Sequence, residues 1–196
     1  MVSHELVFGL VDRHFLDADR LRRVAAFSNV GRQVEGWFKA EMIYLLADAK
    51  ARGLIDDFKS EAALADQGVS GWGRKRVDFR VEHGGRTIYV EVKTLFHGQQ
   101  GAAVIPVDIY LYRDDIGIWP DLKKLGTLPR GDAFSLLFVH PRPDAASWAR
   151  ALSRARERYA EFDLAELTTV SDYPAELYIA KVAVSRCTDE MSRTDS

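Results

Sequence analysis

The sequence predicts a mixed α/β domain around a central sheet, and three observations support this fold class. Apolar residues recur at helical spacing near the N-terminus and again over residues 31–52. Residues 77–92 alternate between apolar and polar side chains, as the two strands of a hairpin do. Two largely apolar segments, 133–141 and 176–185, have the length and content of buried strands. Helices, strands and helices thus follow one another along the chain, which is typical of an α/β (α+β) domain.

Length and composition limit the classes to which the protein can belong. The 196 residues suffice for one domain with an extension. Hydrophobic residues make up 47% and charged residues 29% of the chain, so a buried core is expected. The net charge of −2 excludes binding to nucleic acid through overall positive charge. The single cysteine, Cys187, excludes an internal disulfide and a multi-cysteine zinc site.

We divide the chain into an N-terminal helical extension (1–30), a main domain (31–185) and a flexible polar tail (186–196). Two amphipathic helices are expected within residues 3–28. The stripe of the first comprises Leu6, Val7, Leu10 and Val11, and that of the second Leu21, Val24 and Ala25. The extension either caps the core or builds a homodimer. No signal peptide or apolar run of membrane-spanning length is present, so a cytoplasmic location without membrane contact is expected.

The first helix of the main domain is predicted from about Gly31 to Arg52. Its end is indicated by Gly53, a residue type favoured after the last helical turn. The apolar stripe of this helix comprises Val34, Phe38, Met42, Leu45 and Ala49.

Two further helices are predicted, over residues 107–125 and 145–161. The segment Pro120-Asp121-Leu122-Lys123 is interpreted as the first turn of a helix, because proline favours that position. Asp121 and Lys123 then point to different sides, so this segment is not taken as a functional site.

The segment 77–92 contains the clearest hairpin. Gly84 and Gly85 suit a two-residue type I′ turn, in which both central residues need a positive φ. This turn sets a register that pairs Val77 with Val92, Phe79 with Val90 and Val81 with Ile88 on an apolar face.

The opposite face of the hairpin carries charges. The same register makes Asp78 face Glu91 directly, with Lys93 two residues further along the strand. Two carboxylates about 5 Å apart repel by roughly 3 kcal/mol at an effective dielectric of about 20, more than the ~0.2–1 kcal/mol of an ordinary cross-strand pair. A divalent cation between them would remove this repulsion. Protonation of one carboxylate, or the nearby Arg76 and Lys93, could also relieve it. The alternative is a solvated polar face whose side chains splay apart.

These residues resemble a known signature. Asp78, followed 13 residues later by Glu91-Val92-Lys93, is similar to the D…(D/E)xK motif of the PD-(D/E)XK, or restriction-endonuclease-like, nucleases. The resemblance covers about residues 31–140 and includes the order of a glutamate-bearing helix, the hairpin, a helix and an apolar strand. Val77 stands where the family often has proline. The resemblance implies a restriction-endonuclease-like core with a central mixed sheet flanked by helices.

The resemblance also implies roles for individual residues. Asp78, Glu91 and the backbone carbonyl of Val92 would hold Mg²⁺, for which Mn²⁺ could substitute. Lys93 would orient the attacking water and offset charge in the transition state.

The family further uses a glutamate from the first core helix. Glu41 lies inside the apolar stripe and Glu35 at its edge, while Glu61 is a third candidate at the start of a first strand. We favour Glu41, because a carboxylate within an apolar stripe needs a reason to be there.

Two basic groups are candidates for nucleic-acid binding. Arg74, Lys75 and Arg76 lead directly into the strand that carries Asp78. Arg150, Arg154 and Arg158 recur every four residues and form one stripe on a helix. The alternative for this stripe is a solvated face that pairs with Glu157 and Glu161.

The sequence therefore leads us to expect a Mg²⁺-dependent endonuclease that acts on nucleic acid, with DNA as the preferred substrate. One alternative is a catalytically inactive nucleic-acid-binding or assembly module on the same fold. A second is an interaction domain whose polar hairpin face is only solvated.

Overall fold

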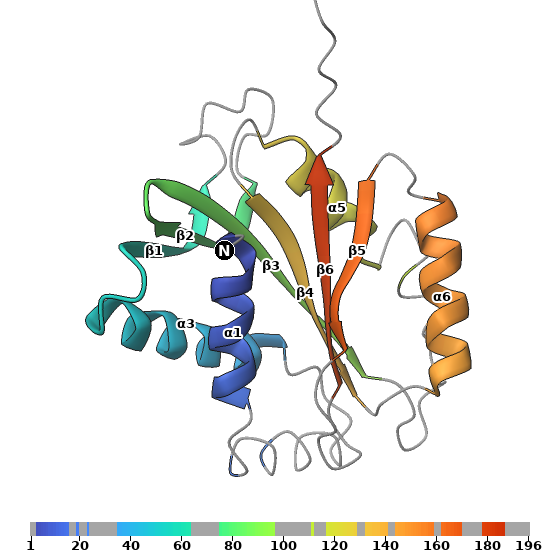
Figure 1. Cartoon of the computed structure of the whole chain (residues 1–196), viewed down its shortest axis with the longest axis horizontal. Coiled ribbons are helices and arrows are strands. Elements are labelled where there is room, and N and C mark those ends of the chain that lie inside the picture. The colour runs from blue at the N-terminus through green and yellow to red at the C-terminus, as the bar shows by residue number, and fades with distance from the viewer. Residues whose placement is uncertain are drawn as a thin grey trace, which may run out of the picture.

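A six-stranded mixed sheet forms the centre of the computed structural model (Figure 1). The structure describes residues 3–15, 19, 23, 35–63, 75–96, 111, 117–128, 132–140, 144–158, 162–169 and 178–186. The strands lie in the order β1-β2-β3-β4-β6-β5. Their bounds are β1 Asp57–Ala63, β2 Arg76–His83, β3 Arg86–Phe96, β4 Asp132–His140, β5 Phe162–Thr169 and β6 Tyr178–Arg186. The β3–β4 pair is parallel, and the other four neighbouring pairs are antiparallel.

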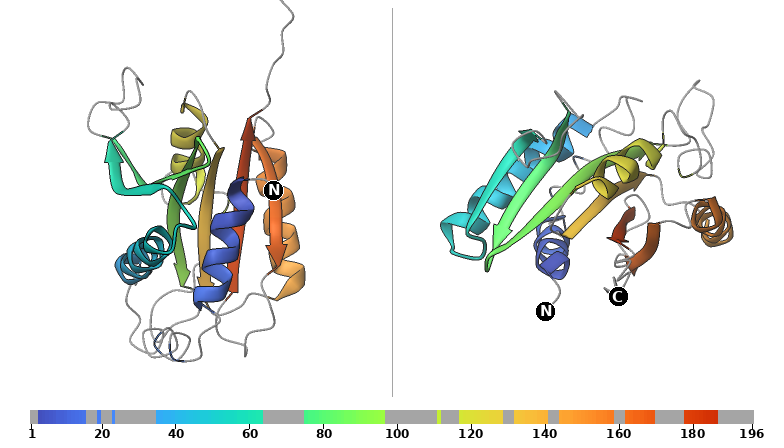
Figure 2. Two further views of the ribbon diagram at one scale, coloured as in Figure 1. Left: turned by 60° about the vertical axis from the view of Figure 1, so that its left-hand side comes forward. Right: turned by 90° about the horizontal axis from the view of Figure 1, so that it is seen from above.

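Helices cover both faces of the sheet and bury two separate apolar clusters (Figure 2). The helices α1 (Ser3–Phe15) and α3 (Glu35–Ala51) pack over one face, against β2, β3 and β4. The helices α5 (Trp119–Gly126) and α6 (Ala145–Arg158) contribute to the cluster on the other face. The predicted α/β class is therefore confirmed, with a mixed sheet flanked by helices.

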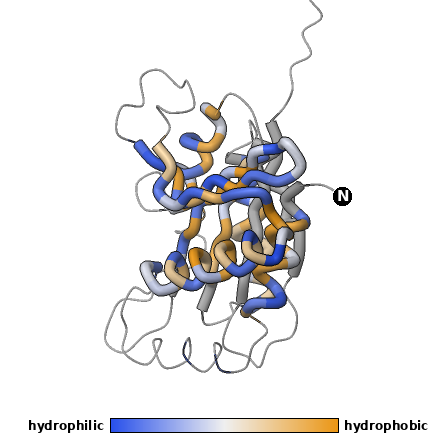
Figure 3. The backbone as a smooth tube through the Cα atoms, turned by 90° about the vertical axis from the view of Figure 1, so that its left-hand side faces the viewer, coloured by the Kyte–Doolittle hydropathy of each residue, from blue (hydrophilic) through white to orange (hydrophobic). Residues whose placement is uncertain are grey.

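The helix α3 confirms four of the five predicted stripe residues and the predicted end near Gly53. The fifth, Val34, and the predicted start at Gly31 lie outside the described residues. Its buried residues are Phe38, Met42, Leu45, Leu46 and Ala49, and apolar positions recur along its turns in Figure 3. After the last turn, Gly53 has a φ of +68°. Its N–H donates to the Lys50 carbonyl and the Leu54 N–H donates to the Ala49 carbonyl, the two bonds of a Schellman motif.

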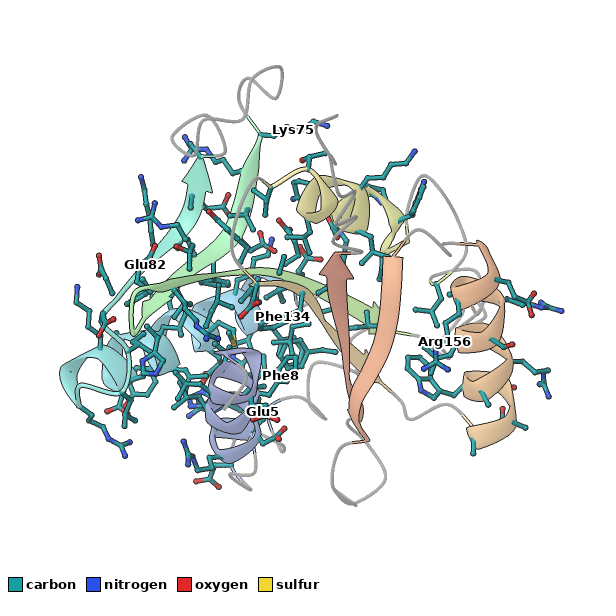
Figure 4. The ribbon with its side chains drawn as sticks, turned by 45° about the horizontal axis from the view of Figure 1, so that its top comes forward. Glu5, Phe8, Lys75, Glu82, Phe134 and Arg156 are labelled. Atoms are coloured by element: carbon teal, nitrogen blue, oxygen red, sulfur yellow. The ribbon has the colours of Figure 1, made fainter. Side chains whose placement is uncertain are left out.

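The helix α1 belongs to the same core as α3. Its buried stripe comprises Val7, Phe8, Leu10, Val11 and Phe15. Phe8 meets Phe134 of β4 edge-to-face with ring centroids 4.5 Å apart (Figure 4). Phe38 of α3 stacks on Phe138 of β4 with centroids 3.9 Å apart. The helix α1, within the predicted extension 1–30, therefore helps to cover the sheet. Capping the core was one of the two roles expected for the extension.

The hairpin turn and its register are confirmed near the turn. Gly84 and Gly85 have φ values of +57° and +74°, as a type I′ turn requires. The pairs Phe79↔Val90 and Val81↔Ile88 occur as predicted.

Other elements differ from the prediction at their ends. β1 begins at Asp57, upstream of the expected start at Glu61. Within the predicted helix 107–125, Leu111 is helical, whereas residues 117 and 118 are not. The helix α5 begins at Trp119, with Pro120 in its first turn, and the other residues between 107 and 116 lie outside the described part of the chain. The predicted second helix of the N-terminal extension lies outside the described residues, apart from positions 19 and 23.

β5 is a strand that the sequence analysis did not predict. Its apolar positions change phase between Leu164 and Ala165, so simple alternation is lost. The ladder with β6 has a corresponding irregularity between Glu166 and Thr169. In the described part of the chain, no helix has the length and apolar content needed to cross a membrane.

Gly85→Ala should destabilise the protein by about 1–2 kcal/mol, because a residue with a side chain incurs a penalty at positive φ. Nothing lies within 4 Å of the new Cβ, so a steric clash does not add to this penalty. Gly9, inside α1, also has open space around it. Gly9→Ala should therefore stabilise the protein by about 0.5–1 kcal/mol, because glycine is a poor helix former. Urea unfolding of both variants checks the prediction. Equal effects of the two substitutions would contradict it.

Candidate active site

Followed from the hairpin turn, the ladder between β2 and β3 ends at Phe79 and does not reach Asp78. Its last pair on this side is Phe79↔Val90. Beyond it, the Val92 N–H donates to Asp78 Oδ2 at 2.8 Å, so a side-chain oxygen replaces a backbone partner. The predicted direct pairing of Asp78 with Glu91, and of Val77 with Val92, is therefore wrong. The two strands separate here, and the carboxylate occupies the gap.

The neighbouring strand β1 is distorted at the same level. Ser60↔Phe79 and Ala62↔Val77 are paired, but Glu61 lies between them with a φ of +48°. This backbone conformation is costly for a residue with a side chain. Val77 then packs in the α5–α6 cluster, whereas Phe79 packs in the α1–α3 cluster, so the predicted single apolar face changes sides at Asp78.

Both predicted carboxylates are buried. Asp78 is 8% exposed and Glu91 only 3%. Tyr89, two residues before Glu91 on β3, is also buried, because α5 and α6 cover this side of the strand. Burial overturns the interpretation of this face as a solvated surface. Carboxylates that lose water need a counter-charge or a proton.

Glu91 receives that counter-charge from α5. Lys124 Nζ lies 2.6 Å from Glu91 Oε1. The pKa of Glu91 is nevertheless raised from 4.5 to about 8, first by burial and then by the nearby negative charges of Asp78 and Asp121. One lysine therefore does not fully compensate the negative charge around Glu91.

Lys93 also meets α5. Its Nζ lies 3.3 Å from Asp121 Oδ2, and Asp121 Oδ1 is 3.6 Å from Lys124 Nζ. Burial acts to lower the pKa of Lys93, but the charges of Asp121, Glu35 and Glu91 outweigh it, so the pKa lies above its ordinary value. Lys93 therefore stays an ammonium ion at neutral pH.

Asp78 is approached by α3 through a lysine that the sequence analysis did not single out. Lys39 Nζ lies 2.7 Å from Asp78 Oδ1 and 3.0 Å from Glu35 Oε1. Burial acts to lower the pKa of Lys39, and its hydrogen bonds to Asp78 and Glu35 raise it above the ordinary value. Glu35, at the first residue of α3, thus shares a cation with Asp78.

Glu41, the glutamate favoured from the sequence, is engaged elsewhere. Its Oε2 lies 2.7 Å from His14 Nε2 of α1, and its Oε1 is 3.9 Å from Arg23 Nη1. The reason for a carboxylate within the apolar stripe is therefore a contact between helices. Glu61, the third candidate, is exposed, and its backbone carbonyl accepts a hydrogen bond from Arg76. The geometry thus favours Glu35 as the glutamate of the site.

Besides Lys39, three functional candidates were missed in the sequence. Asp121 was set aside as part of a helix start. That helix exists, and Asp121 and Lys123 do point apart, but Asp121 points inward and is only 6% exposed. Lys124 lies on the same helix. Ser135 of β4 is the register partner of Glu91 and is fully buried, and its Oγ has no hydrogen-bond partner in the structure as described. The spacing of Asp121 and Lys124, three positions apart on one helix, was the sequence signal that could have identified these two residues.

The two predicted basic groups lie at different places. Lys75 and Arg76 are exposed at the start of β2, close in sequence to Asp78, whereas Arg74 lies outside the described residues. Arg150 and Arg154 are exposed on α6; the side chain of Arg158 is not described. Figure 4 shows Lys75 near the top of the view and α6, with its labelled Arg156, at the right-hand side. The two groups therefore do not form one continuous basic patch.

The donor atoms suit a hard divalent cation only in part. Among the described residues, no group of three or more His, Cys, Asp or Glu side chains could hold a metal ion. Mg²⁺, however, is often bound through one or two carboxylates, with substrate and water as further ligands. Val92 directs its N–H to Asp78, and its carbonyl points to the same side of the strand. Two buried carboxylates with incomplete charge compensation thus fit such a cation.

Comparisons with protein-family models, with characterised proteins and with solved structures gave no match to this chain.

Glu91→Gln should make the stability of the metal-free protein less dependent on pH. A carboxyl whose pKa is raised by folding contributes stability that is fully present below about pH 4.5 and is lost as the pH rises through about 8. Since one pKa unit corresponds to about 1.4 kcal/mol, the wild type should lose several kcal/mol relative to the variant between about pH 5 and pH 9. Urea unfolding in the presence of a chelator measures this difference.

The exposed Glu157 of α6 provides the control. Glu157→Gln should follow the pH dependence of the wild type. If Glu91→Gln does so as well, the pKa of Glu91 is not raised by folding.

Proposed function

We propose that the protein is a metal-dependent nuclease with a restriction-endonuclease-like fold of the PD-(D/E)XK type, acting as an endonuclease on DNA. One observation carries the proposal: two carboxylates, Asp78 and Glu91, are buried where two strands separate, and each feels a nearby charge of this set. The charge of Asp78 raises the pKa of Glu91, and the charge of Glu91 raises the pKa of Lys93. Burying this set of charges is costly for a domain that only needs to fold. Such a cost is expected at functional sites.

The carboxylates would serve as ligands. Asp78, Glu91 and the Val92 carbonyl would hold Mg²⁺, and Mn²⁺ could replace it. A bound divalent ion would supply charge stabilisation at the phosphate and lower the pKa of an attacking water. The Val92 N–H holds Asp78 Oδ2 in place, so Asp78 is oriented before any ion arrives.

Lys93 would act as a fixed positive charge. Its raised pKa suits it to stabilise negative charge on the phosphate and to orient water, and not to remove a proton. Asp121 would hold the ammonium group in place from α5. Glu35 would complete the site from α3, through Lys39.

Substrate binding would begin at the end of β2. Lys75 and Arg76 are exposed there, three and two residues before Asp78. Positive side chains at this position can contact phosphates on either side of the cleaved bond. The preference for DNA, and the use of a homodimer to cut two strands, follow from the family resemblance.

Cleavage of supercoiled plasmid DNA in Mg²⁺ or Mn²⁺ tests the proposal. The wild type should nick the plasmid, and a chelator should stop the reaction. Asp78→Asn and Lys93→Met should each lower the initial rate at least about 100-fold, because each removes charge stabilisation that acts directly at the phosphate. Calorimetric titration with Mg²⁺ should show saturable binding that Asp78→Asn abolishes.

Lys123→Met is the matched control for Lys93→Met. Lys123 is exposed on α5, and its Nζ lies 4.5 Å from the centre of the Trp119 ring. Nicking by this variant at the wild-type rate would link the loss of activity to Lys93. Metal binding without cleavage of DNA or RNA would favour the inactive binding or assembly module. Absence of both metal binding and cleavage would refute the nuclease proposal.

Two glutamates on α3 distinguish a role in the site from a role in helix packing. Glu35→Gln should lower the cleavage rate about ten-fold or more with little change in melting temperature, as for residues that orient metal ligands. Glu41→Gln should lower the melting temperature, because it removes the carboxylate charge that the buried His14 contacts, and leave the rate per folded molecule unchanged. The reverse pattern would restore Glu41 as the glutamate of the site.

A further inference from the structure

Each candidate metal ligand is held by a lysine that has a second acid one turn earlier on its own helix. On α5, Lys124 Nζ lies 2.6 Å from Glu91 Oε1 and 3.6 Å from Oδ1 of Asp121. On α3, Lys39 holds Asp78 and lies 3.0 Å from Glu35, four residues before it. The same arrangement thus reaches the site from both faces of the sheet.

The α5 pair differs from ordinary surface ion pairs. The side chains of Lys124 and Asp121 are 16% and 9% exposed, so water screens them poorly. The Lys124 ammonium group contacts an oxygen atom of Glu91, one of the two carboxylates that would hold the metal ion. A cation and Lys124 therefore compete for Glu91, and whichever is displaced needs another partner.

We propose that Lys124 is an internal cation that pairs with Glu91 in the metal-free protein and moves to Asp121 when a divalent ion binds. This inference rests on the proposed function, because it presumes that Asp78 and Glu91 bind the ion. Asp121 acts as the receiving acid, and it already holds Lys93 through its other oxygen. The exchange leaves Glu91 and Lys124 each with a partner of opposite charge in both states. Lys124 and Asp121 are thus positioning residues that set the metal affinity.

Isothermal titration of the full chain with MgCl₂, and in parallel with MnCl₂, measures this competition without any substrate. Lys124→Met removes the competing cation and should tighten binding about ten-fold. Asp121→Asn removes the receiving acid, leaves Lys124 on Glu91 and should weaken binding by about three- to ten-fold. Lys123→Met, on the exposed side of the same helix, should bind as the wild type does.

The double variant separates the exchange from simple attraction. Asp121→Asn should weaken metal binding in the wild-type background but not in the Lys124→Met background. Without Lys124, no displaced ammonium group needs Asp121 as its new partner. If Asp121 acts only by attracting the ion, Asp121→Asn should weaken binding equally in both backgrounds. That result would overturn the inference. Lys124→Arg retains the competing charge and should bind within about two-fold of the wild type, which controls for loss of packing.

The outcomes also separate this inference from the proposed function. If Asp78→Asn abolishes binding but Lys124→Met leaves the affinity unchanged, the metal site stands and the exchange is refuted. If neither the wild type nor Lys124→Met shows binding that depends on Asp78, both proposals fall. Circular dichroism melts establish that each variant is folded at the temperature of the titration.

Discussion

The hydrogen bond from the Val92 N–H to Asp78 is the interaction on which the centre of the molecule depends. It satisfies a buried backbone donor that would otherwise need a partner strand. The strand ladder can therefore end at Phe79 without an energetic penalty, and the two strands can separate. The separation lets Asp78 face the α3 side through Lys39, while Glu91 and Lys93 face α5. One side-chain acceptor thus determines where the sheet opens and which charges meet there.

Local features of the sequence were enough to predict much of this architecture. The glycine pair determined the turn and the register near it, because positive φ at both positions is a strong constraint. Helical spacing of apolar residues identified the buried faces of α1 and α3. The combination of Asp78, Glu91 and Lys93 could be singled out because opposed carboxylates within an otherwise regular hairpin are unusual.

The rest depends on contacts between distant segments. The parallel pairing of β3 with β4 brings Ser135 beside Glu91, and α5 covers the same face of the sheet. No sequence periodicity links Asp121 to Lys93. The choice between Glu35 and Glu41 depended on the position of His14, which belongs to another helix. The end of the ladder at Asp78 could not be predicted either, because alternation continues through Val77 although the backbone does not follow it.

The parallel arrangement of β3 and β4 has a consequence for biosynthesis. A parallel pair requires the chain to cross back over the sheet between the two strands, and α5 lies on this crossing. Leu122 and Leu125 of α5 share their apolar cluster with Trp148 and Leu152 of α6. The ribosome must therefore release α6 before α5 has its full packing surface. A nascent chain that ends before α6 would carry Asp78 and Glu91 without a firmly docked Lys124, so the charge set would be completed only late in translation.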